Sequence, residues 1–145
     1  MSNERICVVM FKRKVAYYET DRMGIVHHSN YIRYFEEARL YWLEEHSLAY
    51  DTLESMGVML PVVSVSANYY KPLKFGDTFS IETKLIHYTN TKITLSYQVK
   101  NATNGELCAT GESVHGFVDN NFKPIALKRV YPQTFELFKN ALVTD

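Results

Sequence analysis

The feature that most constrains the fold is a predicted helix over residues 30–46 whose apolar residues occupy most of its circumference. At about 100° per residue, Arg33, Glu37 and Glu44 fall on one narrow polar stripe. The apolar side chains spread over more than half of the remainder, at Tyr31, Ile32, Phe35, Ala38, Trp42 and Leu43. A flat surface cannot cover so wide an apolar face, so the rest of the chain is expected to wrap around this helix.

Alternation of apolar and polar residues predicts the strands that would cover the helix. Residues 5–18, which precede it, are rich in Val, Ile and aromatic side chains. After it, apolar residues occupy alternate positions in segments 61–70, 78–88 and 92–100. Alternation of this kind is typical of a strand with one buried face.

A fourth consecutive strand is predicted over residues 106–118, where it would complete an antiparallel meander. It follows Asn104-Gly105, a strong hairpin signal. Its apolar residues change face along the strand, so either a bulge near Gly111 or burial on both faces is expected.

Two shorter helices are predicted over residues 50–56, ending at Gly57, and over residues 132–142. The element order therefore predicts the α+β class, with a curved antiparallel sheet around one long helix. We find no linker, repeat or low-complexity segment, so residues 1–145 are expected to form a single domain.

Charge and hydropathy argue against several kinds of partner. Sixteen Lys and Arg residues balance sixteen Asp and Glu residues, so no basic field is present for nucleic acid or anionic membranes. No apolar run approaches the roughly 18 residues of a membrane-spanning helix. Cys7 and Cys108 are far apart in the chain and are expected to be free thiols, which favours a cytoplasmic location.

The residues best suited to chemistry concentrate in segment 17–39, whose sequence is YYETDRMGIVHHSNYIRYFEEAR. An acidic loop containing Asp21 leads through His28 into the start of the long helix. Ser29 or Asn30 is the predicted N-cap, because a short polar side chain there can accept a free helix N–H. The backbone N–H groups around this point would favour negative charge.

The loop and helix carry a spaced pattern that continues into the later strands. The pattern is Tyr-x-x-x-Asp-x-x-Gly-x-Val-x-His-x-x-Tyr followed by Phe-Glu-x-Ala-Arg. It falls on Tyr17, Asp21, Gly24, Val26, His28, Tyr31, Phe35, Glu36, Ala38 and Arg39. With the strand at 62–72 and Gly76-Asp77, it covers about the first 120 residues and resembles the hotdog-fold acyl-CoA thioesterases of the 4-hydroxybenzoyl-CoA thioesterase-like family.

This resemblance implies a curved sheet around one central helix, in a homodimer or homotetramer with sites at the subunit interface. It also implies an enzyme that hydrolyses an acyl-CoA thioester to a free acid and coenzyme A. No cofactor is expected beyond the coenzyme A of the substrate itself. The family's catalytic carboxylate falls on Asp21, and supporting roles fall on Tyr17 and His28. A thioester of acyl carrier protein stays open as an alternative substrate.

The expected chemistry combines Asp21 with the helix start. Asp21 can act as a nucleophile that forms an anhydride, or as a general base on water. Backbone N–H groups from His28 to Asn30 would stabilise the oxyanion, and one such donor contributes about 10²–10³ in rate. Because a thiolate leaves readily, His28 is interpreted as a positioning or oxyanion residue and not as an obligatory acid.

Substrate contacts are expected from the same loop and helix start, and from lysines that could bind the phosphates of coenzyme A. The expected contacts are Gly24, Ile25, Ser29, Asn30, Tyr31, Lys71 and Lys92. For each lysine, a purely solvated role is the alternative interpretation.

Other interpretations of the motif stay open. Asp21 could be a turn residue, and Tyr17 an ordinary strand aromatic. A hotdog dehydratase or hydratase would place a histidine five residues after the acid, where this chain has Val26. A non-catalytic or weakly catalytic acyl-thioester-binding dimer is the alternative from a different class. Adjacent His27 and His28 would point about 100° apart on a helix, so no metal site is expected.

Overall fold

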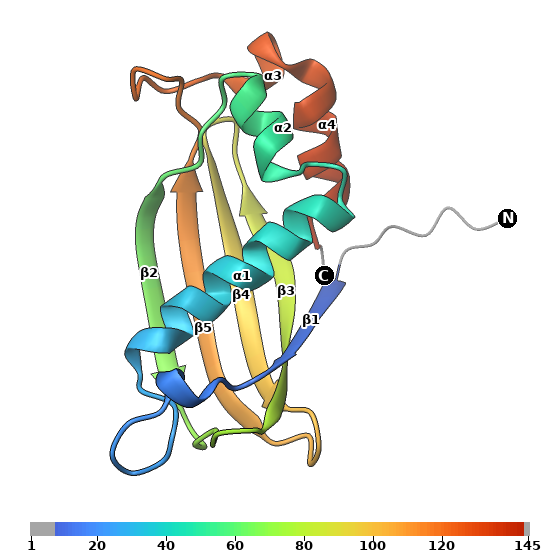
Figure 1. Ribbon diagram of the computed structural model, residues 1–145. Helices are drawn as coiled ribbons and strands as arrows, with labels where there is room; N and C mark the ends of the chain where they lie inside the picture. The colour runs from blue at the N-terminus through green and yellow to red at the C-terminus, as the bar shows by residue number, and fades with distance from the viewer. Residues whose placement is uncertain (1–7, 144–145) are drawn as a thin grey trace, which may run out of the picture.

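The computed structural model describes residues 8–143, which form one antiparallel sheet with a long helix across its face and shorter helices at one end (Figure 1). The five strands are β1 (Val8–Lys14), β2 (Val62–Tyr69), β3 (Thr78–Tyr88), β4 (Lys92–Asn101) and β5 (Leu107–Gly116). The helices are α1 (Ser29–Glu45), α2 (Tyr50–Ser55), α3 (Leu127–Val130) and α4 (Pro132–Ala141), with one 3-10 turn at Tyr17–Glu19. The predicted α+β class is confirmed.

The middle of the sheet follows the predicted alternation. Every second residue of β3 and β4 is buried on the side of α1: Phe79, Ile81, Thr83 and Leu85 in β3, and Ile93, Leu95, Tyr97 and Val99 in β4. The α1 aromatics pack directly on this face, since Phe35 stacks on Tyr97 with ring centroids 4.6 Å apart. The two central strands therefore form the floor of the hydrophobic core.

The strand order, β1-β3-β4-β5-β2, differs from the expected four-strand meander. Strands β3, β4 and β5 are neighbours in space as they are in sequence, but β2 pairs with the far edge of β5. The reason is that β1 occupies one edge of β3, from the Val8–Lys84 pair to the Lys14–Thr78 pair. Because β4 takes the other edge of β3, β2 joins the sheet beside β5.

The expectation that β2 buries one face is wrong for the single chain. Val63 is 55% exposed, and Val62, Val65 and Tyr69 are exposed as well. These four residues, which we call the β2 edge, lie on the outermost strand, which α1 crosses only near one end (Figure 1). Ile32 of α1, expected in the apolar face of the helix, is also 46% exposed. One chain alone therefore leaves apolar surface uncovered.

The change of face predicted in β5 has a different cause from the expected one. A bulge is present, but it lies at Cys108, where β5 has one extra residue opposite Val99 and Lys100. Beyond the bulge, the inward positions are Ala109, Gly111, Ser113 and His115, all buried. The apolar pattern shifts because polar residues, Ser113 and His115, occupy core positions of β5. No bulge at Gly111 is involved.

These inward polar residues are joined in one buried chain of hydrogen bonds. The Tyr97 hydroxyl lies 2.6 Å from Ser113 Oγ, which lies 2.7 Å from His115 Nε2. The other ring nitrogen of His115 faces the Leu60 carbonyl at 3.4 Å. Each polar group thereby has a partner, as buried polar groups generally require.

The helix ends agree with prediction to within one residue, but the predicted N-cap of α1 is wrong. Helix α1 begins at Ser29, and His28 is its N-cap without a side-chain hydrogen bond, so Ser29 and Asn30 are not the capping residues. Helix α2 ends just before Gly57, whose φ of +85° favours glycine, as predicted. Helix α4 begins with the expected proline. The four-residue α3 had no clear sequence signal.

Some predictions concern residues that the structure does not describe. Residues 5–7 of the first predicted strand, including Cys7, lie outside the described residues. That strand ends at Lys14 and the chain turns at Tyr17–Glu19, so the predicted end at residue 18 is wrong. Cys108 is a free, buried thiol, as predicted. No helix within residues 8–143 is long and apolar enough to cross a membrane.

Candidate active site

The loop before α1 is a narrow, hydrogen-bonded turn. Thr20 and Val26 face each other in a β-bridge, and Asp21 N–H donates to the Ile25 carbonyl at 2.8 Å. At the tip, Gly24 N–H donates to the Asp21 carbonyl at 3.0 Å, and Gly24 has a φ of +79°. The expected glycine is therefore used to close the turn, because other residues rarely adopt this φ.

The Asp21 side chain has one oxygen engaged in this turn and one available. Its Oδ1 accepts hydrogen bonds from Met23 N–H at 2.8 Å and Ile25 N–H at 3.4 Å. The turn-forming role considered from the sequence is thus present. Asp21 Oδ2 has no hydrogen-bond partner among the described residues, and the side chain is partly exposed. The turn fixes the carboxylate and leaves Oδ2 free for chemistry.

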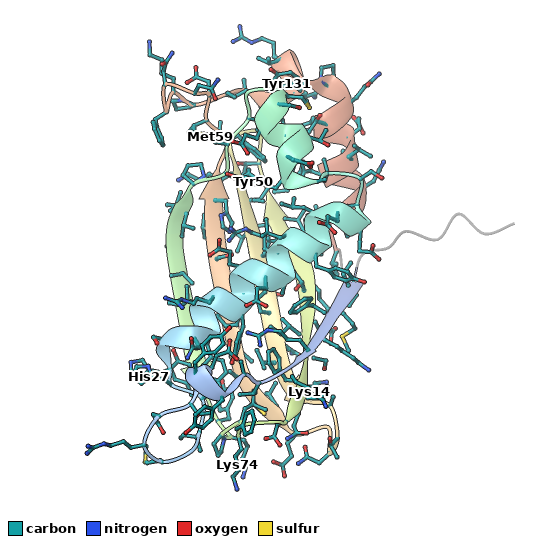
Figure 2. The ribbon with its side chains drawn as sticks, viewed as in Figure 1. Lys14, His27, Tyr50, Met59, Lys74 and Tyr131 are labelled. Atoms are coloured by element: carbon teal, nitrogen blue, oxygen red, sulfur yellow. The ribbon has the colours of Figure 1, made fainter. Side chains whose placement is uncertain are left out.

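A pocket of about 370 Å³ opens beside the loop, at the end of the sheet where Figure 2 labels His27 and Lys74. The loop, the start of α1 and the chain leaving β2 contribute its walls. It is lined by Asp21, Met23, Ile25, Val26, His28, Tyr31, Tyr69, Tyr70, Lys71 and Pro72. Segments far apart in sequence therefore meet at one concave site, which is where ligand sites generally occur.

Five of the residues predicted for the site line this pocket: Asp21, Ile25, His28, Tyr31 and Lys71. Gly24 closes the turn of the loop but does not line the pocket. Tyr69 and Tyr70 were missed, because alternation marked them only as strand residues. The structure brings these five residues together at one pocket, and their roles stay predictions.

Besides Gly24, four other predicted site residues do not line the pocket. Tyr17 is 75% exposed and contacts the ring of Phe75 edge-on. Ser29 Oγ lies 2.8 Å from His27 Nδ1, and the buried Asn30 donates through Nδ2 to the Glu19 carbonyl. Lys92 begins β4 at the opposite end of the sheet, so it cannot reach this pocket within one chain.

Most backbone N–H groups at the start of α1 already have acceptors. Ser29 N–H donates to His27 Nδ1 at 3.2 Å, and Asn30 N–H donates to the His27 carbonyl at 3.0 Å. Within residues 8–143, His28 N–H is the one donor from His28 to Asn30 that has no acceptor. The expected set of oxyanion donors therefore narrows to His28, because the tight first turn uses the other two.

Aromatic contacts hold His28 and shape the pocket wall. The His28 ring stacks on His27 with centroids 4.3 Å apart and lies edge-on to Tyr69 at 6.4 Å. Tyr69 in turn contacts the ring of Tyr31 at 5.1 Å. Burial raises the pKa of Tyr31, so this phenol stays neutral at physiological pH.

A buried acid that sequence reasoning missed, Glu19, lies directly behind the loop. Its carboxylate is bound by Arg13 of β1, by Tyr34 of α1 and by Ala16 N–H. Burial alone would raise the pKa of Glu19, but these hydrogen bonds outweigh it and lower the pKa below the usual range. The only signal in the sequence was an acid two residues before Asp21, and nothing local paired it with Arg13.

The described residues contain no group of His, Cys, Asp and Glu side chains that could hold a metal ion.

The chain has an antiparallel sheet crossed by one long helix, and an acidic loop leads into that helix. This combination is the one expected of a thioesterase-like protein. The family model of the thioesterase-like superfamily matches residues 15–133, and the chain belongs to this family. The thioesterase resemblance of the sequence motif is confirmed.

Individual relatives are named as thioester hydrolases. The "putative acyl-CoA thioesterase YneP" of Bacillus subtilis (strain 168) is 35% identical over 129 residues, which cover 88% of this chain and 93% of that protein. The acyl-CoA thioester hydrolase YbgC of Escherichia coli O6:H1 is 29% identical over 91 residues, which cover 63% of this chain and 68% of that protein. The structure of a DHNA-CoA thioesterase from Staphylococcus aureus matches with a TM-score of 0.86 at 29% identity, covering 91% of this chain and 89% of that one.

Proposed function

We propose that this chain is an acyl-CoA thioesterase that hydrolyses a thioester to a free acid and coenzyme A. The observation that carries the proposal is the meeting of Asp21 and His28 in one pocket at the start of α1. A carboxylate near a free backbone donor is what attack on a thioester carbonyl needs. The named activities of the relatives YneP and YbgC support the same reaction.

In the proposed reaction, the thioester carbonyl oxygen accepts a hydrogen bond from His28 N–H, at the positive end of the α1 dipole. Asp21 uses Oδ2, because Oδ1 holds the turn. It either attacks the carbonyl carbon itself or takes a proton from an attacking water. Collapse of the tetrahedral intermediate breaks the C–S bond and releases the coenzyme A thiolate. In the nucleophilic route, water then hydrolyses the anhydride and regenerates the carboxylate.

The remaining pocket residues are assigned to substrate binding. Tyr31, Tyr69 and Tyr70 provide an apolar wall for the acyl group, aromatic or aliphatic. Lys71 lies at the same pocket and is the predicted lysine best placed to bind a phosphate of coenzyme A.

We further propose that two copies of the chain pair through the β2 edge, as a dimer or within a tetramer. The outer side of β2 has no neighbouring strand in the described chain, and its apolar side chains are exposed. Such an edge is a template for another strand. A second copy would also cover Ile32 of α1, which is exposed in the single chain. The paired sheets would then surround the helices, as in the hotdog arrangement of a sheet around a central helix.

Sedimentation velocity tests this assembly, with Val65→Lys as the perturbation at the β2 edge. We expect the wild type to sediment as a dimer or larger species and the variant to shift toward monomer. A monomeric wild type would contradict the pairing.

The catalytic proposal is tested by thiol release from a panel of short, long and aromatic acyl-CoAs, and from an acyl-carrier-protein thioester. Asp21→Asn should lower kcat by about 10²-fold or more, the loss expected when a positioned acid or base is removed. Asp119→Asn is the matched control, because Asp119 Oδ1 also accepts two backbone N–H bonds in a turn but lies outside the pocket. Equal rates for wild type and Asp21→Asn, or no turnover of any thioester by wild type, would refute the assignment.

A further inference from the structure

Hydrogen bonds of Glu19 connect the loop that carries Asp21 to the rest of the protein. Glu19 is buried, with only 5% of its surface exposed. We propose that Glu19 is a positioning residue for the thioesterase site. Its ion pair with Arg13 sets the place of the Asp21 carboxylate relative to His28 N–H. The inference rests on the function proposed above and gives Glu19 no contact with substrate.

The Glu19 carboxylate joins three parts of the fold. Arg13 of β1 donates through Nη1 to Oε1 at 3.0 Å and through Nη2 to Oε2. The Tyr34 hydroxyl of α1 donates to Oε1 at 2.9 Å, and Ala16 N–H donates to Oε1 at 2.8 Å. The carboxylate therefore holds the entry to the loop against both β1 and α1.

The main chain of the same residue holds the exit from the loop. The Glu19 carbonyl accepts His27 N–H at 2.9 Å and Asn30 Nδ2 at 2.9 Å. Asp21 follows Glu19 by two residues, and His28 follows directly after His27. A shift of Glu19 would therefore move the carboxylate and the backbone donor relative to each other.

Stability of the fold alone does not require a charged group at this place. Apolar replacements of buried ion pairs are often neutral or stabilising. Arg13 also has a second partner, Glu37 of α1, at 2.8 Å from Nε, and Glu37 makes no hydrogen bond to the loop. The two-pronged bond to Glu19 is directional, and a directional bond suits a group that must hold a loop in one position.

Catalysis is sensitive to such positions, because a displacement of about 1 Å can cost about 10²-fold in rate. Glu19→Gln keeps one oxygen for Ala16 and Tyr34 but places an amide NH₂ against the Arg13 guanidinium. We expect kcat to fall at least about tenfold with KM changed less than about twofold. We expect kcat to change more than KM because Glu19 does not line the pocket and so does not contact bound substrate.

Glu37→Gln is the matched control, since it removes the other carboxylate from Arg13 without touching the loop. We expect its kcat to stay within about twofold of wild type. Tyr34→Phe is a second test of the contacts that hold Glu19, because it removes one hydrogen bond to the Glu19 carboxylate without changing the charge. It should also lower kcat, by a smaller factor than Glu19→Gln. If Glu19→Gln does not fold, Tyr34→Phe still tests the positioning role.

Backbone amide NMR shifts of the substrate-free protein provide a test that does not depend on activity. Glu19→Gln should move the amide signals of Asp21, His27 and His28, and Glu37→Gln should leave them in place. Unchanged loop signals in Glu19→Gln and Tyr34→Phe would overturn the positioning role, and so would equal losses of kcat in Glu19→Gln and Glu37→Gln. If Glu19→Gln moves the loop signals but the wild type hydrolyses no thioester, the proposed function is refuted and the positioning of the loop by Glu19 stands.

Discussion

Gly111 in β5 is a position where a single added methyl group should destabilise the protein. A Cβ on Gly111 would lie 2.3 Å and 2.5 Å from Cε2 and Cζ of Phe35, and 2.8 Å from the Ser66 carbonyl oxygen. The carbonyl belongs to the backbone of β2 and cannot rotate away. The Phe35 ring is buried and stacked on Tyr97, so it cannot move without losing that contact. We therefore predict that Gly111→Ala is strongly destabilising for so small a change.

The size of the effect follows from two opposing contributions. Overpacking a buried site costs about 1–3 kcal/mol, and the upper end applies because both a ring and a backbone carbonyl obstruct the methyl group. Replacing glycine by alanine within a strand offsets about 0.5–1 kcal/mol. The expected net loss is about 2 kcal/mol. For a chain of 145 residues, this lowers Tm by about 6–8 °C.

Urea and thermal unfolding, followed by circular dichroism at one fixed protein concentration, measure this loss. Gly116→Ala is the matched control in the same strand, because a Cβ there would meet its nearest atoms at 3.9 Å and 4.0 Å. No clash opposes the gain of about 0.5–1 kcal/mol there, so that control should be as stable as wild type or up to about 1 kcal/mol more stable.

A Phe35→Leu background tests the cause of the loss. Leucine lacks the ring atoms that obstruct the methyl group, so Gly111→Ala should cost at least about 1 kcal/mol less in this background. An equal cost in both backgrounds would refute the role of the Phe35 contact. A Gly111→Ala variant as stable as Gly116→Ala would refute the steric argument altogether.

Two further predictions concern buried polar groups. Burial, followed by the charge of Arg39, lowers the pKa of His115 to about 4, whereas an unfolded histidine titrates near 6.5. The unfolded chain therefore binds more protons in this window, and urea titrations should show the free energy of unfolding falling by up to about 1.4 kcal/mol per pH unit from about pH 6.5 to 4. The Thr83 hydroxyl is buried without a partner among the described residues, so Thr83→Val should raise the free energy of unfolding by about 1 kcal/mol, measured from the urea midpoint.

Each of these predictions has its own control. His115→Gln should flatten the acid dependence, while the exposed His87→Gln should keep it. The same slope in His115→Gln and wild type would show that another group causes the loss. Thr94→Val, on the outer face of β4, lacks a buried unpaired hydroxyl and should not stabilise. A destabilised Thr83→Val would mean that its hydroxyl has a partner after all.

Local pattern was sufficient for much of this fold. The alternation of β3 and β4 predicted their bounds and buried faces, because both strands are covered by α1 along one side. Glycine at the end of α2 and proline at the start of α4 marked helix ends, because their backbone restrictions act locally. The motif around Asp21 and His28 predicted two residues that do share a pocket, because they are close in sequence.

Pattern was insufficient wherever a distant partner decides the outcome. The apolar residues of β2 alternate as a buried strand would, yet pairing at the sheet edge leaves them exposed. Ser113 and His115 look like surface residues, yet Tyr97 and Leu60 satisfy them in the core.

The candidate site divides in the same way. The sequence by itself determined the acid, the glycine turn and the helix start, because each depends on residues a few positions apart. Only the tertiary structure decided that Tyr69 and Tyr70 join the pocket, that Lys92 lies at the other end of the sheet, and that Glu19 ties the loop to Arg13. Pairing between strands and burial of charge depend on what the folded chain brings together, and linear spacing does not encode those contacts.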